Sequence, residues 1–123
     1  MSIEQFCRGF LSGNKRYNHL YGILYEYGAA FESVGVRRMF HNRESFTDSF
    51  PAICATVLRS RGTDSAYVLS VLGFALHVTE QCKELQWYDA ELMITLLVEI
   101  LVAANFKPCH YCIFTSSYNC IIL

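Results

Sequence analysis

The sequence of 123 residues is long enough for one domain with its own hydrophobic core. Hydrophobic residues make up 53% of it and charged residues 17%, which excludes an intrinsically disordered chain. The net charge of −1 and the scattered basic residues give no argument for a nucleic-acid partner. A chain this apolar is expected to keep some apolar surface, and such surface commonly meets a partner.

Two helices are predicted in the first third of the chain. Ser2 and Gln5 fit a capping box, in which each side chain bonds the other residue's backbone N–H, just before an apolar stripe of helical spacing. Gly13 suits a left-handed end to this first helix. Asn14 is expected to cap a second helix, which carries apolar and aromatic residues on one side and ends at Gly35.

A short helical stretch and one longer helix are expected between residues 36 and 62. Residues 36–40 predict one or two loose turns, and residues 45–49 predict a turn region. Pro51 suits the first turn of the helix that follows, because its missing N–H would have no partner there. The basic run 59–62, which closes with a glycine, is expected to end that helix.

Residues 64–79 predict a central helix around which the rest of the chain is organised. Between Ala66 and Val78 only Ser70 and His77 interrupt the apolar residues, so the helix is apolar on nearly every face and must be enclosed. Its length of roughly 20 Å is short of the roughly 30 Å hydrocarbon core of a membrane. We therefore expect burial among other helices, with His77 as a hydrogen-bonded core residue.

A last apolar helix and a cysteine-rich tail complete the chain. A polar connection over 80–86 precedes a helix that is capped near Asp89 and stops before Lys107. The fold class is therefore all-α: a central apolar helical hairpin surrounded by amphipathic helices, in one domain over residues 1–108. Residues 109–123 lack a clear period, and a short helix, a strand-like wrap and a flexible tail all stay open.

The six cysteines indicate reduced, buried thiols more than a disulfide framework, since the N-terminus shows no secretory signal. This usage favours the cytosol or the nucleus. Cys109 and Cys112 have metal-ligand spacing, but without a second paired half we expect no metal site. No catalytic motif or cofactor loop is found, so an enzyme is not expected. Cys120 begins a C-a-a-X prenylation signal, and membrane association is expected only if this residue is lipidated.

Three motifs carry a resemblance to the Bcl-2 family of apoptosis regulators, and most of all to a short viral member. Residues 24–31, with a leucine, a glycine four residues on and a phenylalanine, are similar to the BH3 pattern. Residues 45–47, Ser-Phe-Thr, resemble the family's Pro-Phe-Thr start of the next amphipathic helix. Residues 58–74 resemble the BH1 motif and the apolar helix that follows it. The family's BH1 arginine is Tyr67 here, with Arg59 or Arg61 as a candidate substitute.

The resemblance implies a hydrophobic surface groove that receives an amphipathic BH3 helix of a pro-apoptotic protein. Its walls, carried over by position together with two additions from the same helix face, would be Phe31, Met39, Phe40, Ile53, Cys54, Val57, Leu58, Asp64, Ala66, Tyr67, Leu69, Ser70 and Phe74. Without the arginine, an ion pair worth about 1.5–3 kcal/mol would be lost. We therefore expect a narrow range of partners, because discrimination falls to the apolar pockets.

The function implied by the resemblance is anti-apoptotic: sequestration of pro-apoptotic proteins of the Bim or of the Bak and Bax kind. Its place would be the host cytoplasm or the mitochondrial outer membrane. Two alternatives stay open, a pro-apoptotic relative of the same fold and a helical adaptor that self-associates, as a homodimer for example.

Overall fold

The computed structural model describes the backbone of residues 1–29, 31–59, 64–109 and 120–122, and the side chains of these residues except at 28, 29, 57, 64, 109 and 120–122. The described chain is mostly helical, which confirms the all-α class. The elements in chain order are α1 (Ile3–Leu11), the 3₁₀ turn η1 (Lys15–Tyr17), α2 (Asn18–Ala29), α3 (Val36–Met39), α4 (Arg43–Ile53), the π-helical segment η2 (Cys54–Leu58), α5 (Asp64–Cys82), α6 (Ala90–Ala103), β1 (Lys107–Cys109) and β2 (Cys120–Ile122).

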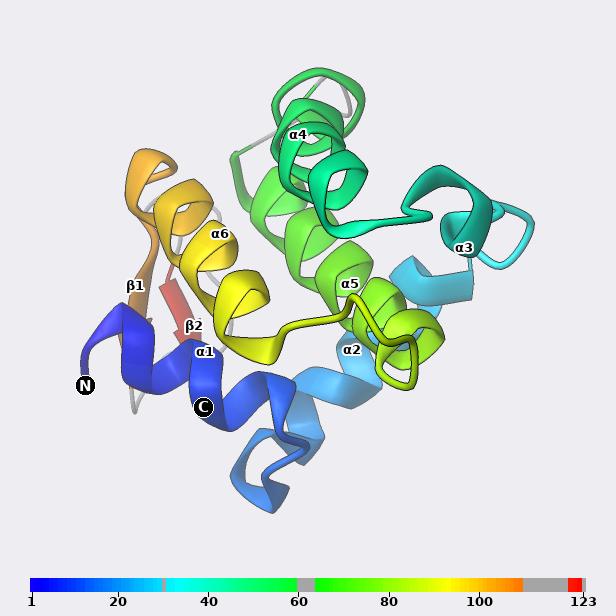
Figure 1. Cartoon of the computed structure of the whole chain (residues 1–123). Helices are drawn as coiled ribbons and strands as arrows, with labels where there is room; N and C mark the ends of the chain where they lie inside the picture. Colours follow the sequence, from blue (N-terminus) through cyan, green and yellow to red (C-terminus); the bar gives the residue numbers. More distant parts are fainter. Residues whose placement is uncertain (30, 60–63, 110–119, 123) are drawn as a thin grey trace.

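Helix α5 lies in the middle of the fold, as its composition predicts. The other helices are arranged around it, with α2 and α3 packed against one side and α4 and α6 on the other (Figure 1). Six of its hydrophobic side chains have no solvent exposure at all: Val68, Val71, Leu72, Ala75, Val78 and Cys82. At about 25 cal/mol per Å² of apolar surface, burial on this scale is the main term holding the bundle together.

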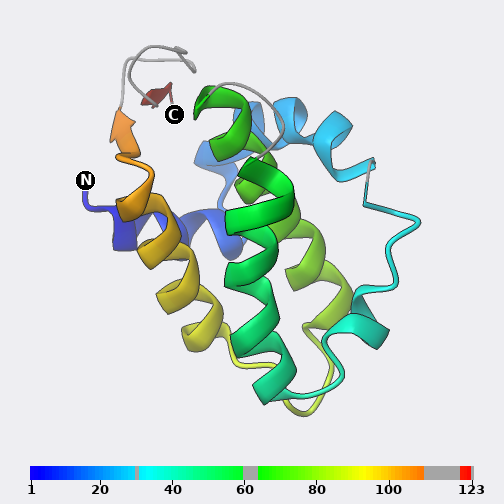
Figure 2. The same cartoon turned by 90° about the horizontal axis from the view of Figure 1, so that it is seen from above.

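Helix α6 is buried on one side and exposed to solvent on the other. It contributes the fully buried Met93, Leu97 and Leu101 to the core, and it packs on α1, α4 and α5. Its opposite side is solvent-exposed at Glu91, Thr95, Glu99 and Val102. The predicted apolar hairpin therefore consists of one enclosed helix and one helix at the edge of the bundle, beside α4 (Figure 2).

Capping residues define the helix starts that sequence predicts best. The Ser2 hydroxyl accepts from the Gln5 backbone N–H at 3.0 Å, and the Gln5 side chain accepts from Ser2 N at 2.8 Å, which confirms the capping box. Gly13 has φ +80°, the left-handed conformation expected at the end of α1. Asp89 caps α6, accepting from Glu91 N at 2.9 Å.

The predicted second helix was too long. α2 ends at Ala29, so Phe31 lies in the turn that follows, where Val34 N donates to Phe31 O at 3.0 Å. Gly35 does not end that helix but precedes the first residue of α3. Asn14 caps η1, accepting from Arg16 N at 3.0 Å, and not α2 itself.

The predicted turn over 45–49 was wrong, because α4 begins at Arg43. The Asn42 side chain accepts from Ser45 N at 2.8 Å and the Ser45 hydroxyl accepts from Asn42 N, so a second capping box starts the helix before the expected turn. Pro51 therefore lies inside α4, where its missing N–H removes one helical hydrogen bond. The backbone becomes π-helical three residues later, in η2.

The structure also differs from the prediction at the end of the central helix, and it adds two strands after the last helix. The central helix runs three residues beyond the predicted end, through Cys82, into the expected polar connection. Beyond α6, β1 and β2 pair in parallel, with Lys107 opposite Cys120. Of the tail whose structure the sequence leaves open, residues 109 and 120–122 are in these strands, and the other residues lie outside the described part of the chain.

Candidate functional site

Five phenylalanine rings form a contiguous group, here called the aromatic cluster. They come from the turn after α2, the end cap of α3, α4 and α5: Phe31, Phe40, Phe46, Phe50 and Phe74. The Phe74 ring is stacked on Phe50 with centroids 5.5 Å apart and an interplanar angle of 5°. Its centroid lies 5.0 Å from that of Phe31 and 6.3 Å from that of Phe40. Three predicted groove residues are thereby brought together.

The aromatic cluster is closed in this structure. Its most exposed member, Phe31, has 8% of its surface exposed, and Phe40, Phe46 and Phe50 have none. These rings fill the space between the helices that the resemblance assigns to a groove. A ligand helix therefore meets no open channel at this cluster and has to displace part of it.

The other predicted groove residues lie in three different environments. Cys54, Leu58, Leu69 and Ser70 are buried beneath the surface of α4, η2 and α5. Ile53 and Ala66 are partly exposed, and Met39 is exposed over 38% of its surface at the edge of α3. The side chains of Val57 and Asp64 are outside the described residues. Met39 is therefore the predicted wall residue that a partner reaches most directly.

A single hydrogen bond ties α3 to the end of the central helix. Arg37 Nε donates to the backbone oxygen of Gln81 at 2.8 Å. α3 has only four residues, and Gly35 before it supplies no side-chain cap. So short a helix is marginal by itself. One side of the aromatic cluster is therefore covered by a helix that depends on its packing against α5.

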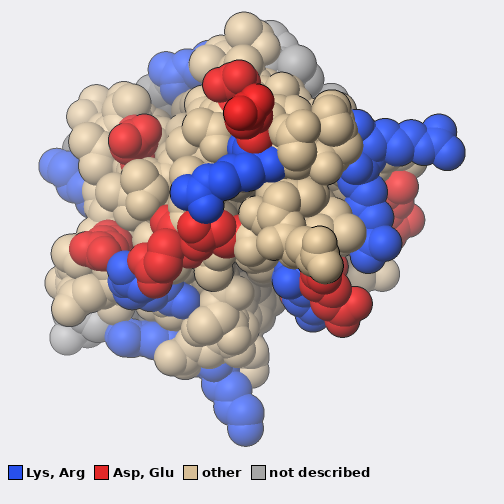
Figure 3. Space-filling view, in the orientation of Figure 1, with Lys and Arg blue, Asp and Glu red and all other residues tan. Residues whose placement is uncertain are grey.

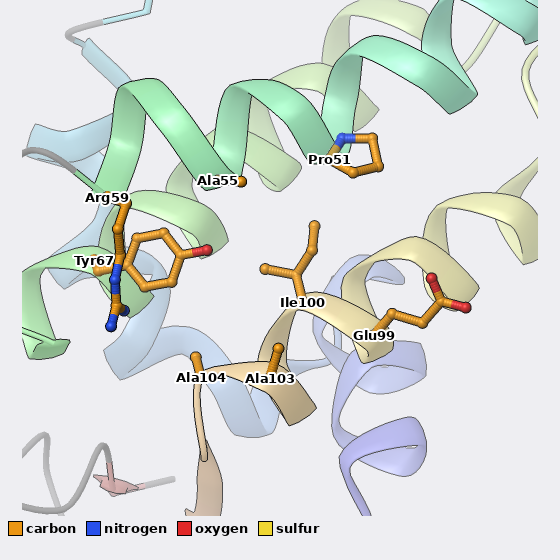
Figure 4. A pocket seen from close by; sticks show the side chains of 8 residues that line it. All are labelled: Pro51, Ala55, Arg59, Tyr67, Glu99, Ile100, Ala103 and Ala104. Carbon is orange, nitrogen blue, oxygen red and sulfur yellow. The ribbon is translucent and has the colours of Figure 1, made fainter.

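A pocket of about 460 Å³ lies between α4 and α6, here called the α4–α6 pocket (Figure 4). Its lining consists of small or apolar side chains with one charged residue at each end: Pro51, Ala55, Arg59, Tyr67, Glu99, Ile100, Ala103 and Ala104. The Arg59 guanidinium lies over the Tyr67 ring, 4.6 Å from its centroid, in a cation–π contact. Burial raises the pKa of the Tyr67 hydroxyl, and it outweighs the nearby Arg59 charge, which lowers it.

Tyr67 and Arg59 line the α4–α6 pocket and are not members of the aromatic cluster. Sequence reasoning placed Tyr67 in the groove wall and considered Arg59 as a substitute anchor there; both line a different recess, and Arg61 is outside the described residues. The pocket itself was missed. Its signal in the sequence was the pair of alanines that ends α6, next to Lys107-Pro108, which leaves no bulky side chain to fill the space.

His77 differs from its prediction. Its Nε2 atom is buried and has no hydrogen-bond partner among the described residues, although we expected a satisfied core histidine. Its ring centroid is 6.1 Å from that of Phe31. Burial lowers its pKa, opposed by the charge of Glu32, so the environment favours the neutral imidazole over the charged one.

Three of the six cysteines, Cys7, Cys54 and Cys82, are buried without a disulfide, as expected. Burial, aided by the charge of Glu4, raises the pKa of the Cys7 thiol to about 12, and burial alone does the same for Cys54. These thiols are therefore inert packing groups at neutral pH. The other three, including the candidate lipidation site Cys120 and the Cys109–Cys112 pair, are outside the residues whose side chains are described.

The described part of the chain contains no group of three or more histidine, cysteine or acidic side chains placed to hold a metal ion. None of its helices combines the length and the apolar composition needed to cross a bilayer. On the face shown in Figure 3, basic and acidic side chains are interspersed and form no extended patch of one sign. The lining of the α4–α6 pocket, by contrast, is mainly small or apolar between its two charged ends.

In comparisons with known proteins, the chain matches no family model, no curated protein and no solved structure. The fold and the site define the protein as an all-α bundle around a buried central helix, with a closed aromatic cluster and, between α4 and α6, a pocket lined mainly by small and apolar side chains.

Proposed function

We propose that this protein is an anti-apoptotic, Bcl-2-like binder that sequesters pro-apoptotic BH3 helices between α2, α3, α4 and α5. The observation that carries the proposal is the aromatic cluster, in which the predicted wall residues Phe31, Phe40 and Phe74 meet beside a helix of only four residues. An amphipathic helix binds by placing apolar side chains at i, i+3, i+4 and i+7 into such a surface. The activity would be exercised in the cytoplasm of a host cell, at the mitochondrial outer membrane.

Binding in this proposal proceeds by displacement. The incoming helix moves α3 and takes over the contacts that α3 makes with α5, so the protein must first leave its closed state. The apparent dissociation constant is then the intrinsic one divided by the fraction of molecules that are open. Partners with the best apolar fit overcome this cost, which supports a narrow range of partners.

The position of Tyr67 supports the same selectivity. In the resembled family an arginine at this position neutralises an aspartate of the BH3 helix, and here a tyrosine lines the α4–α6 pocket instead. A bound BH3 helix therefore lacks its common charged anchor. The apolar side chains of each partner are left to decide which of them binds.

We expect Met39→Glu to weaken the binding of a BH3 peptide about tenfold or more, because it places a charge on the exposed apolar edge of α3. The measurement is fluorescence anisotropy of labelled Bim-like and Bak-like BH3 peptides titrated with the full chain. Val102→Glu is the matched control, since Val102 is 56% exposed on α6, away from α3. Absence of binding by every peptide to the unmodified protein removes the proposed function.

We expect Arg37→Ala to tighten BH3 binding about threefold, because it removes the hydrogen bond to Gln81 O that holds α3 closed. Arg38→Ala removes the same charge from the next residue, which lacks this bond, and serves as the control. Stopped-flow mixing with the labelled peptide checks that the change lies in the association rate. Equal effects of the two variants would mean that charge, and not the opening of α3, governs binding.

A separate experiment tests whether the protein is anti-apoptotic or pro-apoptotic. Purified protein added to isolated mitochondria with an activating BH3 peptide is expected to reduce the release of cytochrome c. Release caused by the protein alone would instead assign it to the pro-apoptotic relatives of the same fold. Heat-unfolded protein provides the control for nonspecific membrane effects.

A further inference from the structure

The α4–α6 pocket combines an apolar floor with two charges of opposite sign at its ends. Ala55 and Ile100 lie near its middle, Arg59 lies at one end and Glu99 at the other, as Figure 4 shows. Because the side chains of Ala55 and Ala103 are small, a partner can come close to the backbones of η2 and α6. A partner that fits must therefore be apolar in its centre, with an acid opposite Arg59 and a base opposite Glu99.

The two helices beside the pocket, α4 and α6, run in the same direction. Their first turns are joined by an ion pair between Arg43 Nη1 and Asp89 Oδ2 at 3.0 Å. Their last turns diverge around the pocket, where Arg59 follows η2 and Ala104 follows α6. The two charges thus lie along the helices, one after the other, and an antiparallel copy of the same surface presents them in the complementary order.

We infer that the α4–α6 pocket is the contact surface for a second copy of this chain, related to the first by a two-fold axis through Ala55 and Ile100. In this arrangement Arg59 of each protomer faces Glu99 of the other, and the two pockets face each other across the axis. A two-fold interface is self-complementary by construction, so opposite charges at equal distances from its axis pair twice.

The state of the charged residues around the pocket supports this occupant. Glu99 is exposed and has no hydrogen bond or ion pair with any described residue, whereas other acids of α6 and its cap are matched within the chain. Glu91 accepts from Arg8 Nη1 at 2.6 Å, and Asp89 pairs with Arg43. The Arg59 guanidinium is positioned over the Tyr67 ring, so its charge is held at the end of the pocket. Among the acids of α6 and its cap, the one that a second copy needs is the one without a partner in the described chain.

This surface is separate from the aromatic cluster, and its test is independent of BH3 binding. The full chain is examined by sedimentation velocity over a range of protein concentrations, with a monomer of 14.1 kDa as the reference. A concentration-dependent species of twice that mass is expected. A protein that stays monomeric at all concentrations overturns the inference and leaves the pocket to another partner or to the chain's own C-terminal residues.

Substitutions that reverse the charge of Arg59 or Glu99 test whether the dimer forms through the α4–α6 pocket. Arg59→Glu and Glu99→Arg, each alone, place like charges opposite each other twice, and the dimer dissociation constant is expected to rise about tenfold or more. Arg59→Glu combined with Glu99→Arg restores opposite pairs and is expected to restore the dimer. Glu84→Arg, an exposed acid in the connection before α6, is the control and is expected to leave dimerisation unchanged.

Mixing the two single variants gives the sharpest result. The Glu99→Arg protomer carries a base at both ends of its pocket and the Arg59→Glu protomer carries an acid at both ends, so both ion pairs form across a mixed dimer. We expect an equimolar mixture of two monomeric variants to sediment as a dimer, which a misfolded variant does not do. A mixture that stays monomeric, or a dimer that is indifferent to all these substitutions, overturns the inference.

Discussion

Replacing Phe74 by alanine is expected to lower the free energy of unfolding by about 3–5 kcal/mol, the usual cost of removing a buried aromatic ring. Phe74 is 2% exposed, and its ring contacts those of Phe31, Phe40 and Phe50. The cavity would lie between α3, α4 and α5, where three rings lose a shared neighbour. Its neighbours come from different helices, so local collapse cannot fill it without moving a helix.

Urea denaturation followed by circular dichroism measures this change. The control is Val102→Ala, which truncates an exposed side chain and is expected to alter stability by less than about 0.5 kcal/mol. A loss below about 1 kcal/mol for Phe74→Ala would show that the aromatic cluster is open in solution. Leu58→Glu and Phe74→Glu are unsuitable as binding probes, because both positions are buried and a charge there unfolds the protein.

The second large effect is expected at alkaline pH, where stability should fall as the pH rises from about 9 to 12. Burial raises the pKa of the Cys7 and Cys54 thiols from 9.0 to about 12, so the folded protein keeps protons that the unfolded chain releases. A raised pKa stabilises the fold fully below the unfolded value and loses this contribution as the pH approaches the folded value. Each thiol contributes a slope of up to about 1.4 kcal/mol per pH unit within this window.

The urea midpoint, measured from about pH 7 to pH 11, checks the alkaline effect. A variant with both Cys7→Ala and Cys54→Ala is expected to be less stable at neutral pH, because both side chains are fully buried, yet to show a flatter decline at alkaline pH. Burial also raises the pKa of Tyr88, so some decline remains in the variant. Identical slopes in the two proteins would mean that the thiols do not control the transition.

Sequence alone was sufficient for the features that depend on local chemistry. An uninterrupted apolar run between Ala66 and Val78 has to be enclosed whatever surrounds it, and α5 is the enclosed helix. Ser2, Gln5 and Asp89 satisfy backbone groups within three residues, so their caps were readable directly. Buried, reduced cysteines followed from their scattered positions in an apolar chain, and the described three agree.

Local patterns failed where two of them competed. Pro51 indicates a helix start, but the pairing of Asn42 with Ser45 begins α4 eight residues earlier, and the helix tolerates the proline inside. Periodicity also extended the second helix through Phe31, whereas contact with Phe74 holds this ring in a turn. Both errors concern boundaries, which depend on interactions that a single window of sequence does not contain.

Only the tertiary structure decided how the candidate surfaces are arranged. Tyr67 and Phe74 are seven residues apart on one face of α5, yet one lines the α4–α6 pocket and the other joins the aromatic cluster. The difference arises because the Phe50 ring of α4 stacks on Phe74, whereas the alanines at the end of α6 leave the space beside Tyr67 unfilled. Helical spacing determines which residues share a face, but the volumes of side chains from distant segments determine whether that face is filled.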